Sequence, residues 1–345
     1  MRLGKFSLSL IALLIGMAAL TAPTASGDNV NAQTAGPQNP SGAQNAGALN
    51  VSCDTGTGVL YGTLELPAAK PPFPIALLIA GSGPTDRDGN SPMLPGKNDA
   101  LKMIAQALAA RGIASLRYDK RAIAASKAAG LKEADLRFDI YVDDAVRWGQ
   151  QLRKDGRFNA LVIAGHSEGS LIGMLAAQKL GASGYVSIAG PGRPAATIIM
   201  EQVRAQPIGP DLLKQVEDVV KSLEEGRQVE PVPAALAPML RPSVQPYLIS
   251  WFKYDPAREI AKLKMPVLIL QGTTDIQVSV NDAKLLASAL PAAKLVMLDG
   301  INHVLKEAPA DRAKQVASYS DPSLPVSPRL LEEVIGFING LKPQK

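Results

Sequence analysis

A serine between two glycines is the first feature of this sequence that indicates nucleophilic chemistry. Residues 165–169, Gly-His-Ser-Glu-Gly, fit the pattern G-x-S-x-G. The pattern is short, but it directly follows the apolar run 161–164, typical of a buried strand, and directly precedes a helical pattern. A strand, a tight turn and a helix in this order form a nucleophile elbow, which exposes the serine Oγ above a sheet and over the positive end of the helix dipole. Ser167 is therefore the predicted nucleophile.

A serine nucleophile needs a base, because its hydroxyl reacts poorly until the proton is removed. Histidine is the usual base near neutral pH, and the chain has two, His166 and His303. His166 adjoins the serine and is expected to point elsewhere in an elbow. His303 follows the last predicted strand, where a loop can bring it over Ser167. A structural role is the alternative for a lone histidine, but an elbow serine with one candidate base favours catalysis.

Two aspartates compete for the role of orienting this histidine. Asp275 follows the predicted strand 267–270 at the carboxyl edge of a sheet, and the order Ser167, Asp275, His303 is the one expected for this arrangement. Asp299 is closer to His303 in sequence, but the short separation is expected to place it at the end of the adjoining strand. Asp275 is therefore the predicted acid of the triad.

Backbone donors for an oxyanion are expected beside the elbow. Residues 81–84, Gly-Ser-Gly-Pro, follow a predicted buried strand. A turn there can aim the N–H of Ser82 at a developing oxyanion, with the N–H of Glu168 as the second donor. A plain Gly/Pro turn is the alternative, because backbone groups leave no side-chain signature in a sequence.

Two other motifs point to different chemistry, and each lacks a required element. Residues 86–90 begin like a calcium loop, but the EF-hand pattern then needs glycine and glutamate where Ser91 and Lys97 stand. Residues 250–253 fit S-x-x-K, the nucleophile motif of penicillin-binding proteins and β-lactamases, but the accompanying S-D-N and K-T-G elements do not occur. The single cysteine, Cys53, excludes an internal disulfide and argues against a cysteine-rich metal site.

The elements that must position these residues alternate between strands and helices. Apolar runs or alternating patterns predict strands at 59–66, 75–80, 113–118, 160–164, 185–189, 267–270 and 294–298. Amphipathic patterns predict helices at 101–110, 141–154, 170–180, 280–290 and 330–341. This alternation predicts an α/β fold with a mostly parallel sheet covered by helices on both faces.

Residues 193–255 interrupt the alternation, whereas 49–192 and 256–345 are predicted to form the core. The interruption contains helical patterns, one of them at 212–223, and many prolines but no strand. It most simply forms a helical cap over the carboxyl edge of the sheet; a surface insertion is the alternative. Its charges nearly balance, so we expect it to select a neutral or apolar acyl group. Apolar residues that could line its pocket include Ile198, Ile199, Met200 and Val203.

The N-terminal residues are typical of an exported protein. Two basic residues precede the apolar run 6–20, which is short for a membrane span, and small residues follow it. Residues 1–27 are predicted to be a signal peptide, with cleavage before Asp28 or before Gln33; an uncleaved anchor is the alternative. Residues 28–48 are small and polar, which predicts a flexible linker. After cleavage we expect no stable membrane span and a periplasmic or secreted location.

Composition limits the remaining classes of protein. The chain has 345 residues, 46% hydrophobic and 19% charged, which excludes a mostly disordered, collagen-like or disulfide-stapled protein. The net charge of +5 would fall by two with the loss of Arg2 and Lys5, and no dense basic stripe is present, so we expect no nucleic-acid partner. The oligomeric state is left open.

With these residues identified, the sequence resembles the α/β-hydrolase superfamily over nearly all of residues 50–345. More narrowly, GSGPTDRDGN (residues 81–90) is similar to the opening signature of a bacterial serine-esterase branch related to a thermophile carboxylesterase. RYDKR (residues 117–121) is similar to a second segment of that branch. The branch usually continues with G-x-G-x-S, whereas this chain has AIAAS (residues 122–126), which affects the local turn but not the triad.

The resemblance implies an α/β-hydrolase fold and hydrolysis of a small-molecule carboxylic ester through an acyl-enzyme, with no cofactor. Ser167 would attack the acyl carbonyl, His303 would move the proton and Asp275 would orient His303. A serine at the elbow argues against the dehalogenase and epoxide-hydrolase branches, which use aspartate there. A serine peptidase, thioesterase or acyltransferase on the same triad, or a non-catalytic binding protein, are the alternatives, because a fold does not determine a substrate.

Overall fold

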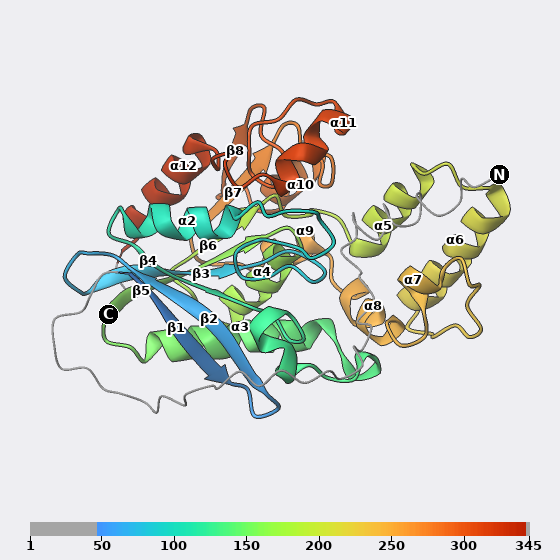
Figure 1. The fold of residues 1–345 in the computed structure, drawn as a ribbon, viewed down its shortest axis with the longest axis horizontal. Coiled ribbons are helices and arrows are strands. Elements are labelled where there is room, and N and C mark those ends of the chain that lie inside the picture. The colour runs from blue at the N-terminus through green and yellow to red at the C-terminus, as the bar shows by residue number, and fades with distance from the viewer. Residues whose placement is uncertain (1–46, 343–345) are drawn as a thin grey trace.

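The computed structural model describes residues 47–342, and an eight-stranded sheet runs through this part of the chain (Figure 1). The strand order is β1-β2-β4-β3-β5-β6-β7-β8; β1, β2 and β4 pair antiparallel, and all other neighbours pair in parallel. The strands are Gly47–Asp54 (β1), Val59–Leu66 (β2), Phe73–Ile79 (β3), Ala114–Tyr118 (β4), Phe158–His166 (β5), Gly184–Ile188 (β6), Val267–Gly272 (β7) and Lys294–Leu298 (β8). The predicted signal peptide and residues 28–46 of the predicted linker lie outside the described residues.

Helices cover both faces of this sheet. They are Ala100–Ala109 (α2), Phe138–Arg153 (α3), Glu168–Leu180 (α4), Ala195–Arg204 (α5), Pro210–Glu224 (α6), Ala237–Leu240 (α7), Gln245–Phe252 (α8), Pro256–Ile260 (α9), Val280–Ala289 (α10), Arg312–Gln315 (α11) and Pro328–Asn339 (α12). The described residues also form the short 3-10 helices Ala124–Ala129 (η1), Glu133–Asp135 (η2) and Val316–Ser320 (η3). Among the described helices, none has the length and apolarity needed to cross a bilayer.

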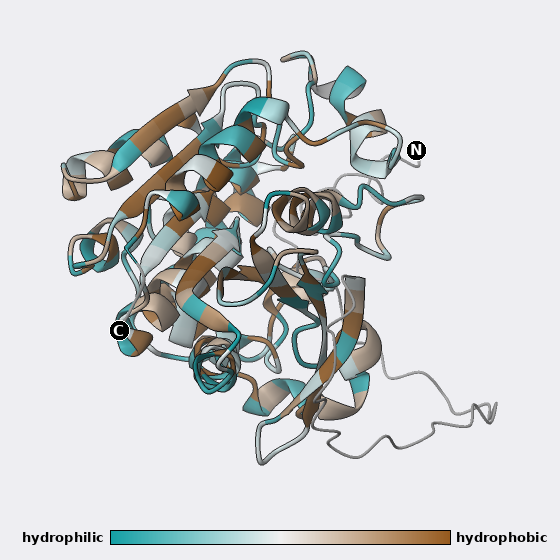
Figure 2. Ribbon diagram, turned by 90° about the vertical axis from the view of Figure 1, so that its left-hand side faces the viewer, coloured by the Kyte–Doolittle hydropathy of each residue, from teal (hydrophilic) through white to brown (hydrophobic). Residues whose placement is uncertain are grey.

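The sheet separates two hydrophobic cores. Along β3, Ile75 and Leu77 pack into the core that contains α3, α4 and α10, whereas Ala76 and Leu78 pack into the core under α2 and α12. Successive side chains of a strand point to opposite faces, so a strand buried on both sides is apolar throughout. Figure 2 shows this concentration of hydrophobic residues on the central strands. The predicted α/β arrangement is confirmed.

Helices α5 to α8 all lie in the segment predicted to be a cap, and Figure 1 shows them grouped beyond one end of the sheet. Within the described chain, no strand lies between α5 and α8. An aromatic cluster joins α8 to α3: the rings of Phe138 and Trp251 are stacked with centroids 5.8 Å apart, and Tyr247 packs against both. Ring contacts of this kind stabilise packing beyond the area they bury. The group of helices α5 to α8 is therefore fixed to the core through α8.

Strand β1 was not predicted, and it overlaps the predicted linker. The linker prediction is wrong for residues 47–48, because β1 begins at Gly47. Leu49, Val51 and Cys53 alternate with polar residues, but only Cys53 of this strand is fully buried. Hydrogen bonding to β2 over its whole length holds β1 at the edge of the sheet instead.

Candidate active site

Ser167 stands on a strained turn between β5 and α4. Its φ of 55° and ψ of −124° are rare for a residue with a side chain. The Ser167 N–H donates to the Ile188 carbonyl of β6 at 3.0 Å, which holds the turn. A Cβ on Gly165 would lie 2.0 Å from the Gly169 oxygen, and one on Gly169 would lie 2.5 Å from the Ile79 oxygen. The motif therefore needs both glycines, because backbone passes where a side chain would stand.

His303 and Asp275 form a buried hydrogen-bonded pair after β8 and β7. His303 Nδ1 donates to Asp275 Oδ2 at 2.8 Å. The backbone N–H groups of Gln277 and Val278 donate to the other carboxylate oxygen, at 2.8 and 3.0 Å. Burial alone would raise the pKa of Asp275, but His303 and these N–H groups outweigh it and the pKa is lowered. An ionised Asp275 keeps the proton on His303 Nδ1 and leaves Nε2 able to accept one.

Asp299, the competing acid, does not meet this histidine. Its side chain is exposed and accepts a hydrogen bond from Thr273 Oγ1 at 3.0 Å. As expected from the sequence, it follows directly on the end of β8. The structure therefore brings Asp275, and not Asp299, to His303.

The expectation that His166 points away from the site is wrong. The centroids of the His166 and His303 rings lie 4.8 Å apart. His166 Nε2 is 2.8 Å from the His303 backbone carbonyl, to which it donates. Burial, and then the neighbouring His303, lower the pKa of His166 to about 3, so His166 is neutral at ordinary pH. His303 is thus held at its ring by Asp275 and at its backbone by His166.

The predicted oxyanion donors, Ser82 and Glu168, lie in two segments beside Ser167. Ser82 follows β3, and its neighbour Gly81 approaches the elbow so closely that a Cβ there would lie 3.1 Å from Ser167 Cβ. Glu168 is the first residue of α4, so its N–H belongs to the unpaired groups at the positive end of the helix dipole. Ser82 and Ser167 also line the same two cavities.

A buried lysine that sequence reasoning missed connects the two donor segments. Lys120 Nζ donates to the Gly81 carbonyl at 2.5 Å and to Glu168 Oε2 at 3.1 Å. Tyr247 of α8 donates to the other oxygen of Glu168. The Gly81 carbonyl and the Ser82 N–H belong to one planar trans peptide and point in opposite directions, so fixing the first fixes the second. The signal available in the sequence was RYDKR, in which Lys120 stands.

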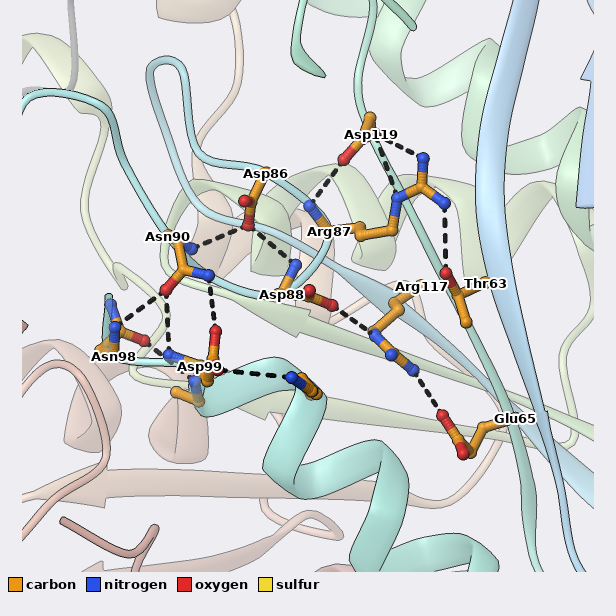
Figure 3. A network of polar contacts seen from close by, with 12 residues as sticks. Thr63, Glu65, Asp86, Arg87, Asp88, Asn90, Asn98, Asp99, Arg117 and Asp119 are labelled. Carbon is orange, nitrogen blue, oxygen red and sulfur yellow. Dashed lines mark hydrogen bonds and ion pairs between the residues drawn. The ribbon is translucent and has the colours of Figure 1, made fainter. Parts of the chain in front are cut away.

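Ion pairs attach the loop after β3 to β4 and its end, and Arg117 of β4 pairs in turn with β2, as Figure 3 shows. The pairs are Arg87 with Asp119 (2.6 Å), Arg117 with Asp88 (2.7 Å) and Arg117 with Glu65 (2.9 Å). Asp86 accepts from the N–H groups of Asp88 and Asn90, so the carboxylates of the calcium-like stretch are engaged by the chain itself. Among the described residues, no group of three or more His, Cys, Asp and Glu side chains is placed to hold a metal ion. The network thus fixes the loop that begins with Ser82.

The turn after RYDKR keeps the conformation that glycine favours, although alanine stands there. Ala122 and Ala124 have φ values of 65° and 41°. Ser126 is buried, and its Oγ accepts from the Tyr61 N–H at 2.9 Å. The AIAAS segment thus holds two alanines in the left-handed region, in a turn that Ser126 ties to β2.

Ser250, the serine of the S-x-x-K match, has a structural role. Its Oγ accepts from the Phe138 N–H at 2.8 Å and donates to the Tyr247 carbonyl at 2.7 Å, which joins α8 to the start of α3. Lys253 is exposed. Ser250 therefore lacks the lysine partner that the motif requires.

Two cavities meet at Ser167. The larger, about 130 Å³, is lined by parts of residues 81–101 and 303–319. The smaller, about 50 Å³, lies under α5 and α8 and is lined by Ile198, Ile199 and Trp251 among others. Of the four apolar residues expected to line a pocket in the predicted cap, Met200 and Val203 instead pack in the hydrophobic core. The predicted cap thus walls only the smaller cavity.

A mostly parallel sheet, with an elbow after β5 and the acid and histidine after β7 and β8, is the α/β-hydrolase fold. Est1E from Butyrivibrio proteoclasticus, solved with ferulic acid bound, aligns with a TM-score of 0.57 at 18% identity, over 84% of this chain and 99% of Est1E. The esterase Pf2001 of Pyrococcus furiosus aligns with a TM-score of 0.53 at 13% identity, over 86% of this chain and 91% of Pf2001. These likenesses confirm the predicted fold class.

In sequence, the chain is similar to the esterase EstD of Thermotoga maritima, with 29% identity over 251 residues. The match covers 71% of this chain and 58% of EstD, so it spans less than two thirds of that relative. No family model matches the sequence. The similarity to EstD agrees with the resemblance to esterases, and the role of the GSGPTDRDGN segment stays a prediction.

Proposed function

We propose that this protein is an exported serine hydrolase that cleaves carboxylic esters through an acyl-enzyme on Ser167. The observation that carries the proposal is the buried bond between His303 and Asp275, because it prepares His303 as a base in the cavity that Ser167 also lines. The similarity to EstD supports an ester as substrate. Export rests on the N-terminal residues 1–27, and residues 193–255 would form the cap.

In the proposed reaction, Ser167 Oγ attacks the acyl carbonyl while His303 Nε2 takes its proton. The oxyanion accepts from the N–H groups of Ser82 and Glu168, and the ionised Asp275 stabilises the imidazolium. His303 then gives the proton to the leaving alcohol, and the acyl group stays on Ser167. Water, deprotonated by His303, attacks this acyl-enzyme; the acid leaves and Ser167 regains its proton.

A fluorophosphonate probe tests the nucleophile. We expect it to label the protein once, at Ser167, because only a base-activated serine beside oxyanion donors reacts readily with such a reagent. Mapping of the labelled peptide identifies the site, and folded Ser167→Ala should remain unlabelled. Ser250→Ala is the matched control and should be labelled like the wild type. Labelling that persists in folded Ser167→Ala would contradict the assignment.

Under this proposal Lys120 is a positioning residue for the oxyanion donors. The double variant Lys120→Met with Glu168→Gln removes both charges of the buried pair, so it leaves no buried charge unpaired. We expect kcat to fall about 100-fold, as on loss of one oxyanion donor, with KM changed little. Affinity for a boronic acid, which mimics the tetrahedral intermediate, should fall in parallel with kcat/KM.

A second buried ion pair provides the control for this variant. Arg121, next to Lys120 in sequence, pairs with Asp144 at 2.6 Å, and its guanidinium donates to Asp144 and to the Ala129 carbonyl instead of to the Gly81 carbonyl. Arg121→Met with Asp144→Asn should lower the melting temperature without lowering kcat. If both double variants lose kcat equally, Lys120 has only a structural role.

A further inference from the structure

The two cavities that meet at Ser167 differ in which reacting groups they contain. His303 lines the larger cavity and not the smaller, whereas Glu168 lines the smaller and not the larger. Ser82 and Ser167 line both. The base and one predicted oxyanion donor therefore face opposite sides of the nucleophile.

This difference between the cavities indicates which half of an ester each of them holds. The leaving oxygen must lie beside His303 Nε2, because it receives its proton there. The carbonyl oxygen must face the Ser82 and Glu168 N–H groups. The carbonyl carbon that Ser167 Oγ attacks carries one more substituent, the acyl chain. The space left for this chain is the cavity under α5 and α8. We propose that the larger cavity holds the alcohol part of the substrate and the smaller cavity holds the acyl part, an assignment that rests on the proposed ester hydrolysis.

The volumes set the sizes of the two parts. The larger cavity, about 130 Å³, has more than twice the volume of the smaller, about 50 Å³, so it has room for the bulkier part of the substrate. The wall of the smaller cavity is firm, because Trp251 is stacked on Phe138 and Ile199 is buried. The substrate class is therefore the esters of short acids with bulky alcohols.

The lining of the larger cavity favours an uncharged, largely apolar alcohol. None of the described residues that line it carries a carboxylate, an ammonium or a guanidinium group. Two of its polar side chains already bond to the chain: Asn98 donates to the Gly89 carbonyl, and Thr85 donates to the Ser82 carbonyl. Val316, 55% exposed, adds an apolar side chain at the rim. An aromatic or branched alcohol matches these properties.

Two isomeric esters test the assignment directly. In 2-naphthylmethyl propanoate the bulk is in the alcohol, and in ethyl 2-naphthylacetate the same bulk is in the acid; both release a primary alcohol. With each rate divided by that of alkaline hydrolysis, we expect kcat/KM to favour the first ester by at least about 10-fold. Equal values or the reverse preference would overturn the assignment.

An activated ester of a short acid, p-nitrophenyl acetate, distinguishes failure of this assignment from failure of the proposed function, because its good leaving group needs little positioning. If the protein hydrolyses p-nitrophenyl acetate through Ser167 but neither naphthyl ester, the bulky-alcohol assignment is wrong and the hydrolase proposal stands. If it hydrolyses none of the three, the hydrolase proposal fails as well.

Half-buried residues on opposite walls supply matched variants. Ile198 lines the smaller cavity and Leu94 lines the larger. Ile198→Ala should raise kcat/KM for ethyl 2-naphthylacetate at least about 5-fold and leave 2-naphthylmethyl propanoate nearly unchanged. Leu94→Trp should lower kcat/KM for 2-naphthylmethyl propanoate by a similar factor and leave the other ester nearly unchanged. Variants that change both esters alike would show that the cavities do not separate the two halves of the substrate.

Discussion

Ser167→Ala is expected to lower kcat for ester hydrolysis by about 10⁶-fold, as loss of the nucleophile does in serine proteases. The variant should still be faster than the uncatalysed reaction in water, because the oxyanion donors and substrate binding remain. The measurement is the initial rate on p-nitrophenyl acetate, with near-ultraviolet circular dichroism to verify the fold. Ser250→Ala should keep the wild-type kcat, since Ser250 joins α8 to α3. Folded Ser167→Ala with kcat within 10-fold of the wild type would place the nucleophile elsewhere.

The strain at Ser167 adds a second readout at the same position. A residue with a side chain at φ 55° and ψ −124° is strained, and such strain costs on the order of 1–3 kcal/mol. Glycine adopts this conformation with less strain. Ser167→Gly should therefore raise the free energy of unfolding while abolishing activity, whereas Ser167→Ala should change stability little. A loss of stability in Ser167→Gly would show that the turn is not strained.

The sequence was most informative where a local pattern meets a local backbone requirement. The bounds of β2 and β8 match the predicted strands, because each pattern of apolar residues lies within a single element. The elbow is similar: Gly165 and Gly169 stand where a Cβ would collide with backbone. Each of these features depends on a short stretch of chain, so spacing alone predicts it.

The features that the sequence did not predict depend on contacts between distant residues. His166 reaches a carbonyl 137 positions away, and Lys120 reaches Glu168 across 48 positions. Neither residue has a periodic pattern that shows which partner it meets. The division of the site into two cavities depends in addition on how α5 and α8 lie over the core. Long-range packing therefore determines the proposed positioning residues and the two cavities, whereas local patterns indicate the candidate residues Ser167, Asp275 and His303.

Asp275→Asn is expected to lower kcat about 10⁴-fold and to change KM little, as for the orienting acid of a serine triad. The Gln277 and Val278 N–H groups donate to one side-chain oxygen, and they would hold the asparagine carbonyl in that place. The asparagine NH₂ group would then face His303 and donate to Nδ1. The proton of His303 would move to Nε2, which could no longer accept the serine proton. The side chains of residue 275 and His303 would keep their positions, but the His303 tautomer would be the wrong one for accepting the serine proton.

The same substitution has a pH-dependent effect on stability. The lowered pKa of Asp275 means that the ionised carboxylate stabilises the folded state, fully above the unfolded value of about 3.9 and less as pH falls through the folded pKa. Asp275→Asn should therefore lower the melting temperature more at pH 7 than at pH 3. An equal loss at both pH values would argue that the residue acts through packing alone.

Asp299→Asn is the matched control for the acid. Asp299 is exposed and bonds to Thr273, so its substitution should leave kcat within about 2-fold of the wild type, as for most exposed side chains. Each of the two variants replaces one carboxylate with an amide, so the net charge of the protein changes equally in both. A difference in kcat between them must then come from the contact with His303. If Asp299→Asn were the inactive variant, the orienting acid would be Asp299 and the assignment of Asp275 to that role would be wrong.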